Sequence, residues 1–301
     1  MTRQILLTGA SGYIGGRLLP VLLARGHAVR CLARTPERLI LPPGAEAVRG
    51  DAATGAGLEE ALAGADTAYY LIHSMGRGSD AGSFAARDRQ AARTFGDAAR
   101  RAGVRRVVYL GGLGATGAGA SAHLRSRHEV AELLGERADE FVYARAAMVV
   151  GAGSASFLML DALVRRLPAM ICPRWIGTRS QPIAIGDVVA ALAAAAEQKD
   201  APGEVQLGGA DVLTYRAMMR RYAAVIGRRP PVVVPVPVLT PRLSSYWVSL
   251  VTPVERGLVE PLVDGLSAEM VVDVPPPPGL NDAPLGFEAA ARAALAEAGR
   301  S

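Results

Sequence analysis

Short apolar runs alternate with longer amphipathic stretches along the first half of the chain. The apolar runs predict strands over residues 5–7, 28–33, 45–49, 67–72, 106–110 and 141–145. Amphipathic spacing predicts helices over residues 17–23, 58–62, 84–102 and 121–132, the last with Ser121 as its cap. Because strands and helices of these lengths alternate, we expect right-handed crossovers and an α/β fold with a doubly wound parallel sheet.

A glycine-rich turn links the first predicted strand to the first predicted helix. It reads Thr-Gly-Ala-Ser-Gly-Tyr-Ile-Gly over residues 8–15, and its first glycine step is one residue wider than in the common dinucleotide fingerprint. Such glycines permit a sharp bend, close approach of a pyrophosphate and tight packing of helix on strand. Free amides at the helix N-terminus then meet the phosphates. The cofactor contacts expected here are Gly9, Ser11, Gly12, Tyr13, Ile14 and Gly15.

The residue after the second strand bears on which dinucleotide binds. An acidic residue at this position holds the 2′-hydroxyl of NAD, whereas arginine accommodates the 2′-phosphate of NADP. The chain has Arg34 at this position, so we expect NADP(H) rather than NAD. Arg38, one turn further on, either assists or is a solvated surface residue.

The carboxyl ends of the next three predicted strands add further cofactor positions, because open parallel sheets bind ligands at that edge. Asp51 follows the third strand and is interpreted either as facing the adenine edge or as an ordinary turn aspartate. His73 leaves the fourth strand, and two glycines after the fifth suit close approach to a cofactor ring. The positions expected to contact the cofactor are Asp51, Ala52, Leu71, Ile72, His73, Gly111 and Gly112.

Beyond residue 150 the regular alternation loosens. The later elements are predicted as a helix over 157–167, a strand over 181–185 that runs into an alanine-rich helix, a strand over 204–209 and a helix over 214–226 capped by Thr214. We therefore divide the chain into a dinucleotide-binding core, residues 1–150, and a mixed segment, residues 151–301. About residues 181–210 complete the core, and the remainder forms a smaller C-terminal lobe that covers the substrate.

Charge and composition narrow the classes of function. The 301 residues carry 33 basic and 28 acidic side chains, a net charge of +5 without a long basic run, so no nucleic-acid partner is expected. Lys199 is the only lysine and lies in a polar turn, which argues against lysine-based chemistry. Cys31 and Cys172 lie far apart in apolar surroundings, typical of reduced packed thiols, and no metal site is expected.

The cellular location of the protein is predicted from its N-terminal sequence and from its most apolar late stretch. The N-terminus is already fold-forming sequence without a secretory signal, so a cytoplasmic location is expected. The apolar stretch over residues 231–251 does not resemble a membrane-spanning helix, because it is interrupted by Pro235, Pro237, Pro241 and Arg242. It leaves peripheral membrane contact open.

These motifs resemble the short-chain dehydrogenase/reductase superfamily, specifically its atypical NmrA-like and YbjT-like NAD(P)-binding branch. The resemblance covers nearly the whole chain and rests on residues 8–15, on Arg34, on Tyr70–Ser74 and on Gln181–Val189 with its Gly-Asp-Val. Residues 239–247 also look like uncharacterised bacterial members of this branch. The resemblance implies a Rossmann fold, an NAD(P) cofactor and oxidoreductase chemistry. Helices often pair two subunits in this superfamily, so a homodimer is left open.

The catalytic motif departs from the superfamily pattern Tyr-x-x-x-Lys, in which lysine lowers the tyrosine pKa and tyrosine passes a proton. His123 stands at the tyrosine position and Arg127 at the lysine position. Four residues span slightly more than one helical turn, so both side chains still face the cofactor together. Histidine is a proton donor near neutral pH, whereas arginine binds ribose hydroxyls but is not a base. The superfamily serine is replaced within Gly111–Gly112, with Thr116 or Ser121 as substitutes.

Two classes of function therefore compete. The first is an NADPH-dependent reductase of a small apolar carbonyl, enone or quinone, with His123 or His73 as the proton donor. The second is a non-catalytic NADP(H) redox sensor or scaffold, favoured by the loss of the tyrosine–lysine pair. Membrane-associated quinone chemistry is a third interpretation, which rests only on residues 231–251. Candidate pocket residues for an apolar substrate, each also explained as core packing, are Phe157, Trp175, Tyr246 and Trp247.

Overall fold

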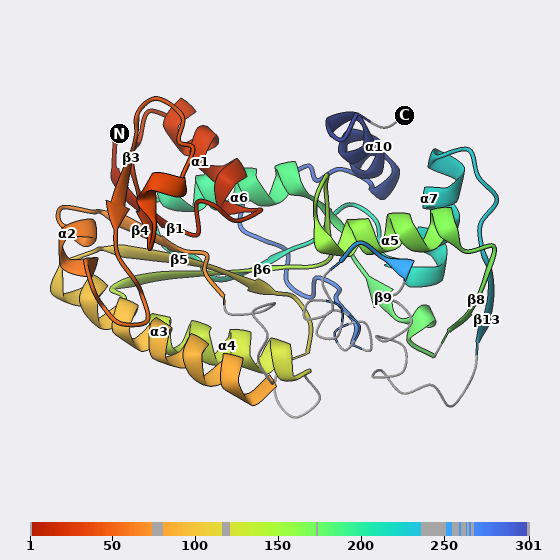
Figure 1. Cartoon of the computed structure of the whole chain (residues 1–301), viewed down its shortest axis with the longest axis horizontal. Helices are drawn as coiled ribbons and strands as arrows, with labels where there is room; N and C mark the ends of the chain where they lie inside the picture. The colour runs from red at the N-terminus through yellow and green to blue at the C-terminus, as the bar shows by residue number, and fades with distance from the viewer. Residues whose placement is uncertain are drawn as a thin grey trace.

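The computed structural model describes residues 2–73, 81–115, 121–172, 174–235, 251–254, 259, 263, 265 and 268–299. Its centre is a seven-stranded sheet in the order β11-β6-β5-β4-β1-β2-β3, with every neighbouring pair parallel (Figure 1). These strands are β1 (Gln4–Thr8), β2 (Ala28–Ala33), β3 (Ala45–Arg49), β4 (Thr67–Tyr70), β5 (Arg106–Gly112), β6 (Glu140–Ala146) and β11 (Gly203–Leu207). The order is that of a doubly wound Rossmann fold, so the predicted fold class is confirmed.

Helices cover both faces of this sheet. One face carries α1 (Gly15–Ala24) and α6 (Ile185–Glu197), and the other carries α2 (Leu58–Leu62), α3 (Ala81–Arg101) and α4 (Ala122–Gly135) (Figure 1). Leu18 and Leu22 of α1 are fully buried on the first face, as is Phe95 of α3 on the second. Each face is therefore sealed by its own apolar core, as parallel sheets require.

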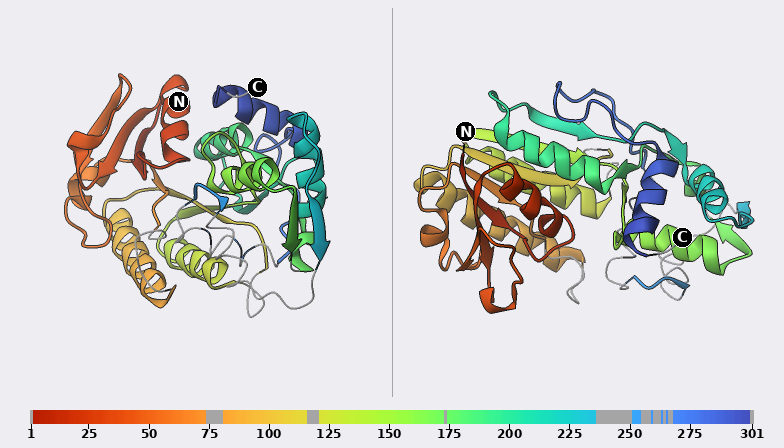
Figure 2. Two further views of the ribbon diagram at one scale, coloured as in Figure 1. Left: turned by 45° about the vertical axis from the view of Figure 1, so that its right-hand side comes forward. Right: turned by 90° about the horizontal axis from the view of Figure 1, so that it is seen from above.

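A second lobe is built from elements that follow β6. Its elements are β7 (Val149–Val150), α5 (Ala155–Arg166), β8 (Ala169–Cys172), η3 (Arg174–Gly177), β9 (Arg179–Ser180), β10 (Ile183–Ala184), β12 (Leu213–Thr214), α7 (Tyr215–Val225), β13 (Val232–Pro235) and α10 (Phe287–Glu297). Phe157 and Tyr222 meet edge to face in its core, 5.3 Å apart between ring centroids. The right-hand view of Figure 2 places this lobe at the end of the molecule opposite β1, β2 and β3.

Three elements of the first half of the chain have the bounds that the sequence predicts. β2, β3 and α2 match the predicted ranges, and the two predicted caps are confirmed, because the side chains of Ser121 and Thr214 accept backbone N–H groups of Leu124 and Ala217. β4 ends two residues earlier than predicted. The reason is that the Leu71 N–H donates to the Thr8 hydroxyl at 2.9 Å instead of to a neighbouring strand.

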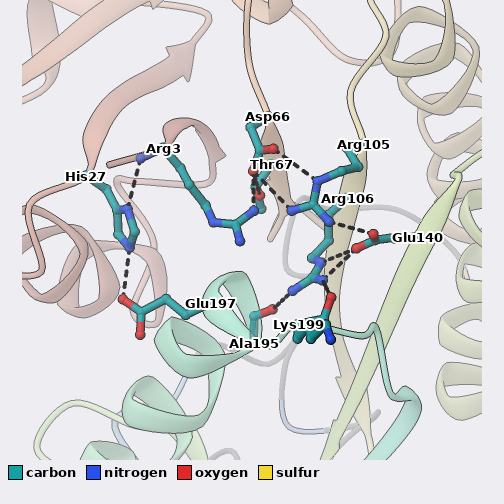
Figure 3. A network of polar contacts seen from close by, with 10 residues as sticks. All are labelled: Arg3, His27, Asp66, Thr67, Arg105, Arg106, Glu140, Ala195, Glu197 and Lys199. Carbon is teal, nitrogen blue, oxygen red and sulfur yellow. Dashed lines mark hydrogen bonds and ion pairs between the residues drawn. The ribbon is translucent and has the colours of Figure 1, made fainter. Parts of the chain in front are cut away.

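Charged residues gather at the amino edge of the sheet, where β1, β4, β5 and β6 begin. Arg106 is fully buried, and its guanidinium lies 2.6 Å from Glu140 and donates to a carbonyl of α6 (Figure 3). Arg105 contacts Glu140 at 2.5 Å and Asp66 at 3.1 Å, and Arg3 lies 2.6 Å from Asp66. Burial disfavours ionised Asp66, but hydrogen bonds from Arg105 and Arg3 outweigh burial and lower the pKa of Asp66 to about 2. We call these five residues the amino-edge network.

Two predictions concern features apart from the site. Both cysteines are buried and free, and burial raises the pKa of Cys31 and of Cys172 to about 11. Among the residues that the structure describes, no helix combines the length and the apolar character needed to cross a bilayer. Most of the stretch 231–251 lies outside the described residues.

Candidate cofactor and substrate site

The glycine turn after β1 can be built only with glycine at two positions. Gly9 has a φ of +73°, and a Cβ on it would lie 2.6 Å from the carbonyl oxygen of Leu71. A Cβ on Gly15 would lie 2.2 Å from the carbonyl oxygen of Gly9. Gly12 closes the turn, since its N–H donates to the Gly9 carbonyl at 2.8 Å. The turn therefore brings bare backbone to the carboxyl edge of the sheet.

The N-terminus of α1 opens directly from this turn. Ile14 is its N-cap residue, with no side-chain hydrogen bond to the helix, and the first turn contains no acidic residue. Its amide dipoles are therefore not offset by a carboxylate, which suits an anionic ligand. The turn fits a dinucleotide pyrophosphate, because Gly9 and Ser11 line the cavity beside it and the helix N-terminus carries no acidic residue.

A first cavity of about 620 Å³, which we call the nucleotide groove, runs along the ends of β1, β2, β3 and β4. Of the residues predicted to contact the cofactor, it is lined by Gly9, Ser11, Arg34, Asp51, Ala52, Ile72 and His73. Arg87 and Asp88 of α3 also line it, and the sequence analysis missed both. A helical pattern shows which side of α3 is apolar, but not how far its polar side reaches over the strand ends.

One end of the nucleotide groove is strongly basic. Arg34 and Arg38 both line it and are exposed. The acid between them, Glu37, forms an ion pair with Arg49. Arg49 also donates to the backbone carbonyl of Arg34 at 2.9 Å, which fixes this segment at the groove. The local carboxylate is thus engaged elsewhere, and two exposed arginines line this end of the groove.

Asp51 lies where it can both contact a bound cofactor and stabilise the turn after β3. It lines the nucleotide groove, and one of its carboxylate oxygens accepts the N–H of Ala53 at 2.8 Å, which is a turn contact. The turn role of Asp51 therefore has a direct geometric basis. Contact with an adenine edge stays a prediction.

A second cavity of about 470 Å³, which we call the apolar cavity, lies between the central sheet and the second lobe. Of the predicted site residues, it is lined by Tyr13, Ile14, His73, Gly112, His123 and Arg127. Its remaining wall is mostly aliphatic and includes four methionines, namely Met148, Met159, Met219 and Met270. Because His73 lines both cavities, the nucleotide groove and the apolar cavity meet at the end of β4.

His123 and Arg127 stand one turn apart on α4, and both are half-buried in the wall of the apolar cavity. Burial and the nearby Arg127 and His73 lower the pKa of His123 to about 3. His123 is therefore a neutral imidazole at neutral pH, able to donate a hydrogen bond from one ring nitrogen. The role of His123 as a proton donor stays a prediction.

The guanidinium of Arg127 donates a hydrogen bond to a tyrosine side chain of the central sheet. Its Nη1 lies 3.4 Å from the hydroxyl of Tyr109, which is fully buried and stacks on Tyr143 with centroids 5.5 Å apart. Burial disfavours the charged guanidinium, but Tyr109 and Asp88 outweigh burial and raise the pKa of Arg127. Arg127 therefore presents a permanent positive charge to the cavity.

Four predicted cofactor residues support the site and do not line either cavity. They are Gly12, Gly15, Leu71 and Gly111. Gly111 makes room for a ring, since a Cβ on it would lie 2.7 Å from Tyr143. Phe157 packs in the lobe core and is absent from the cavity wall. The side chain of Trp175, together with Thr116, Tyr246 and Trp247, lies outside the described residues.

A doubly wound parallel sheet with a glycine turn at its carboxyl edge defines a dinucleotide-binding protein. Residues 9–148 match the family described as NAD(P)H-binding. This match and the fold described above support the resemblance of the chain to atypical, short-chain dehydrogenase/reductase-like NAD(P)-binding proteins.

Curated relatives match about a third of the chain. A 3-beta-hydroxysteroid dehydrogenase of Mycolicibacterium neoaurum is 34% identical over 113 residues, which is 35% of this chain and 31% of that protein. A ketoreductase of Stigmatella aurantiaca that acts on a farnesylated dihydroquinoline oxide is 34% identical over 107 residues, 35% of this chain and 32% of that protein. The matched region thus spans about a third of the length of these relatives.

Solved structures are similar over nearly the whole chain. The triphenylmethane reductase of Citrobacter sp., complexed with NADP(H), has a TM-score of 0.76 at 18% identity and covers 97% of this chain and 100% of its own. The UDP-glucuronic acid 4-epimerase of Bacillus cereus, complexed with NAD, has a TM-score of 0.65 at 16% identity and covers 89% and 97%. At these identities the likeness concerns the fold.

Proposed function

We propose that the protein is an NADPH-dependent reductase of a small apolar carbonyl compound, conjugated alkene or quinone. The observation that carries this proposal is the apolar cavity, which meets the nucleotide groove at His73 and holds Arg127 and His123 in its wall. A cavity of about 470 Å³ is within the size range of small-molecule sites. A protein that only sensed the cofactor would have no use for it.

The preference for NADP(H) is supported by Arg34 and Arg38. Both are exposed on the nucleotide groove, and Glu37 between them is paired with Arg49. Two planar cations suit a 2′-phosphate, whereas a 2′-hydroxyl calls for an acidic partner. NADP(H) is also bound by the triphenylmethane reductase, although NAD is bound by the epimerase.

The cofactor would supply a hydride to the substrate. The residues of the chain would handle the charge that then develops on the substrate oxygen. His123, as a neutral imidazole, would donate a hydrogen bond to that oxygen, and the guanidinium of Arg127 would stabilise its negative charge. His73, where the two cavities meet, is the remaining predicted proton donor.

The apolar cavity favours an apolar body with one polar end over a sugar nucleotide. His73 follows β4, and His123 and Arg127 come from α4, whereas α5 and α7 contribute mainly aliphatic and thioether side chains together with Ser156 and Tyr215. Ser154 is also in the wall, but its hydroxyl already donates to a backbone carbonyl at 2.7 Å. A second phosphate or several sugar hydroxyls would find few partners among the described residues.

The alternative function, a non-catalytic NADP(H) sensor, is favoured by one specific observation. The position of the superfamily tyrosine holds His123, whose low pKa leaves it without an exchangeable extra proton at neutral pH. A sensor would bind NADPH and change its affinity for a partner without oxidising the cofactor.

The two functions differ in a single-turnover experiment. The protein is loaded with one equivalent of NADPH and mixed with a panel of aromatic ketones, enones and quinones, with a UDP-4-ketohexose as a polar control that can also accept a hydride, while absorbance at the NADPH band is followed. The proposal expects oxidation with at least one apolar compound and none with the UDP-4-ketohexose. NADPH binding without oxidation by any member of the panel would favour the sensor.

A further inference from the structure

An exposed apolar surface lies on the second lobe. β8 and β13 pair in parallel, with Val232 opposite Ala169 and Val234 opposite Ile171. All four side chains are exposed, whereas the alternate residues of β8 are buried in the lobe core. Because successive side chains of a strand point to opposite faces, one face of this small sheet packs and the other stands in solvent. We call Ala169, Ile171, Val232 and Val234 the β8–β13 surface.

This surface lies apart from the site. None of its four residues lines the nucleotide groove or the apolar cavity. In Figure 1, β8 and β13 form the far edge of the second lobe, at the end of the molecule opposite β3. The exposed aliphatic groups therefore serve neither cofactor nor substrate contacts directly.

The segments that carry this surface are strongly basic. Residues 162–186 and 212–254 together hold ten arginines and no acidic residue, so they carry more positive charge than the net +5 of the whole chain. Arg166 lies shortly before β8, and Arg228 and Arg229 lie shortly before β13; all three are exposed. The charge is thus placed beside the aliphatic face.

Three of the ten arginines, Arg165, Arg179 and Arg221, form ion pairs with Asp161, Glu269 and Asp211, whereas the hydrogen bonds described for Arg166 and Arg228 are made to backbone carbonyls. The guanidinium of Arg166 donates to the carbonyl of Val251 at 2.9 Å, and that of Arg228 donates to the carbonyl of Arg165 at 2.6 Å. A backbone carbonyl orients a guanidinium but leaves its net charge in place. The combination of exposed aliphatic side chains and these two charged arginines is complementary to a surface that is apolar below and anionic above.

Proline argues against a protein strand as the occupant. β13 is preceded by Pro230 and Pro231 and ends at Pro235. Proline has no N–H to donate, so it protects the ends of an edge strand from pairing with an added strand. The occupant should therefore contact side chains and charges, without hydrogen bonding along the backbone.

We propose that the β8–β13 surface docks reversibly on an anionic phospholipid membrane. Ile171, Val232 and Val234 reach the level of the headgroups, and the neighbouring arginines contact the lipid phosphates. This inference goes beyond the proposed function, since it requires neither NADPH binding nor turnover. It narrows the sequence-based expectation of membrane contact, which rested on residues 231–251, to Val232 and Val234 of that stretch and adds the exposed residues of β8.

Vesicle sedimentation tests the proposal with the full chain. We expect binding to vesicles of phosphatidylcholine with phosphatidylglycerol, weaker binding as salt is raised, and little binding to phosphatidylcholine alone. Arg228→Gln with Arg229→Gln should lower the partition coefficient about thirtyfold. The matched control is Arg100→Gln with Arg101→Gln on α3, which removes the same charge elsewhere and should retain most of the binding.

The apolar part is tested by Val232→Ser with Val234→Ser, against Ile40→Ser, which changes an aliphatic side chain that is 99% exposed elsewhere. The proposal expects loss of vesicle binding only in the first variant. Equal losses in test and control variants, or no preference for phosphatidylglycerol, would overturn it. A lipid-free dimer that the valine substitutions dissociate would also overturn it, since a second copy would then cover the surface. If circular dichroism shows that the valine variant is unfolded, the arginine pair and the salt dependence decide.

Discussion

The arginines at the two edges of the central sheet have different partners. At the amino edge, Arg105 and Arg106 are matched by Asp66 and Glu140, and the buried guanidinium of Arg106 lies 2.6 Å from a carboxylate. At the carboxyl edge, Arg34 is exposed on the nucleotide groove, and the described partner of Arg127 is the Tyr109 hydroxyl. Both edges are rich in arginine and both have acids nearby, but the described carboxylate–arginine ion pairs of Asp66 and Glu140 lie at the first edge, whereas Asp51 and Asp88 line the nucleotide groove at the second.

This difference shows how a parallel sheet separates stability from function. All strands begin at one edge and end at the other, so residues that hold strands together can be kept apart from residues that bind a ligand. The amino-edge network satisfies its own charges and needs no ligand. The carboxyl edge leaves cations, helix amides and a neutral imidazole for phosphates and a substrate oxygen.

The largest expected effect is on stability, at the amino edge. Glu140→Ala leaves the fully buried Arg106 without its carboxylate, and loss of one partner of a buried pair costs about 3–5 kcal/mol. Urea unfolding measures the change. The control is Glu46→Ala, whose exposed ion pair with Arg30 contributes less than about 1 kcal/mol. Equal losses in the two variants would contradict the structural role given to the network.

A smaller effect is expected on cofactor choice, at the carboxyl edge. Arg34→Ala should weaken NADPH binding about ten- to a hundredfold, since a charge-assisted hydrogen bond contributes about 1.5–3 kcal/mol. NADH binding should hardly change. Fluorescence titration of both cofactors measures the difference, and Arg25→Ala, which removes an arginine paired with Glu197 away from the groove, serves as the control. Equal losses for NADPH and NADH would refute the 2′-phosphate assignment.

A third effect concerns acid stability. The pKa of His123 is about 3 in the folded chain and about 6.5 when exposed, so the unfolded state binds the extra proton first as pH falls. Stability contributed by neutral His123 is therefore complete above pH 6.5 and is lost as pH falls toward 3. His123→Asn should reduce this loss by about 1–2 kcal/mol between pH 7 and pH 4.5. Urea unfolding of both proteins at the two pH values measures it. Identical losses would mean that His123 is not buried as described.

The same variant bears on the reaction. If His123 donates a hydrogen bond as a neutral imidazole, turnover by the unaltered chain should show no acid limb from this residue between pH 5 and pH 9. A rate that rises toward acid pH in the unaltered chain, and is flat in His123→Asn, would restore the imidazolium donor.

Much of the cofactor half of the site can be predicted from short stretches of sequence. The turn at Gly9 and Gly15 is readable because a strand, a bend without Cβ atoms and a helix N-terminus follow one another directly. Arg34 is readable because it immediately follows β2. Ser121 and Thr214 are readable as caps because each is polar and precedes an amphipathic run.

The substrate half depends on contacts between distant segments. Met148, Met159, Met219 and Met270 come from four places in the chain and form one wall only when the second lobe packs on the sheet. In sequence, each looks like an ordinary core methionine. The pairing of β13 with β8 cannot be predicted from sequence either, because no local pattern in β13 indicates which strand lies next to it. The low pKa of His123 likewise results from burial by the lobe and from Arg127 and His73 beside it.

The central claim is that the nucleotide groove binds NADPH while the adjoining apolar cavity takes the substrate. Ala155 lines the apolar cavity, so Ala155→Trp should fill part of it, whereas Ala224→Trp adds the same ring at an exposed position of α7. The most direct measurement is kcat/KM for an apolar substrate found in the panel, together with the Kd for NADPH, in both variants. We predict at least a tenfold loss of kcat/KM in Ala155→Trp alone, with the Kd for NADPH unchanged in both. Unchanged turnover in Ala155→Trp, or a loss of NADPH binding equal to the loss of turnover, would contradict this division between the two cavities.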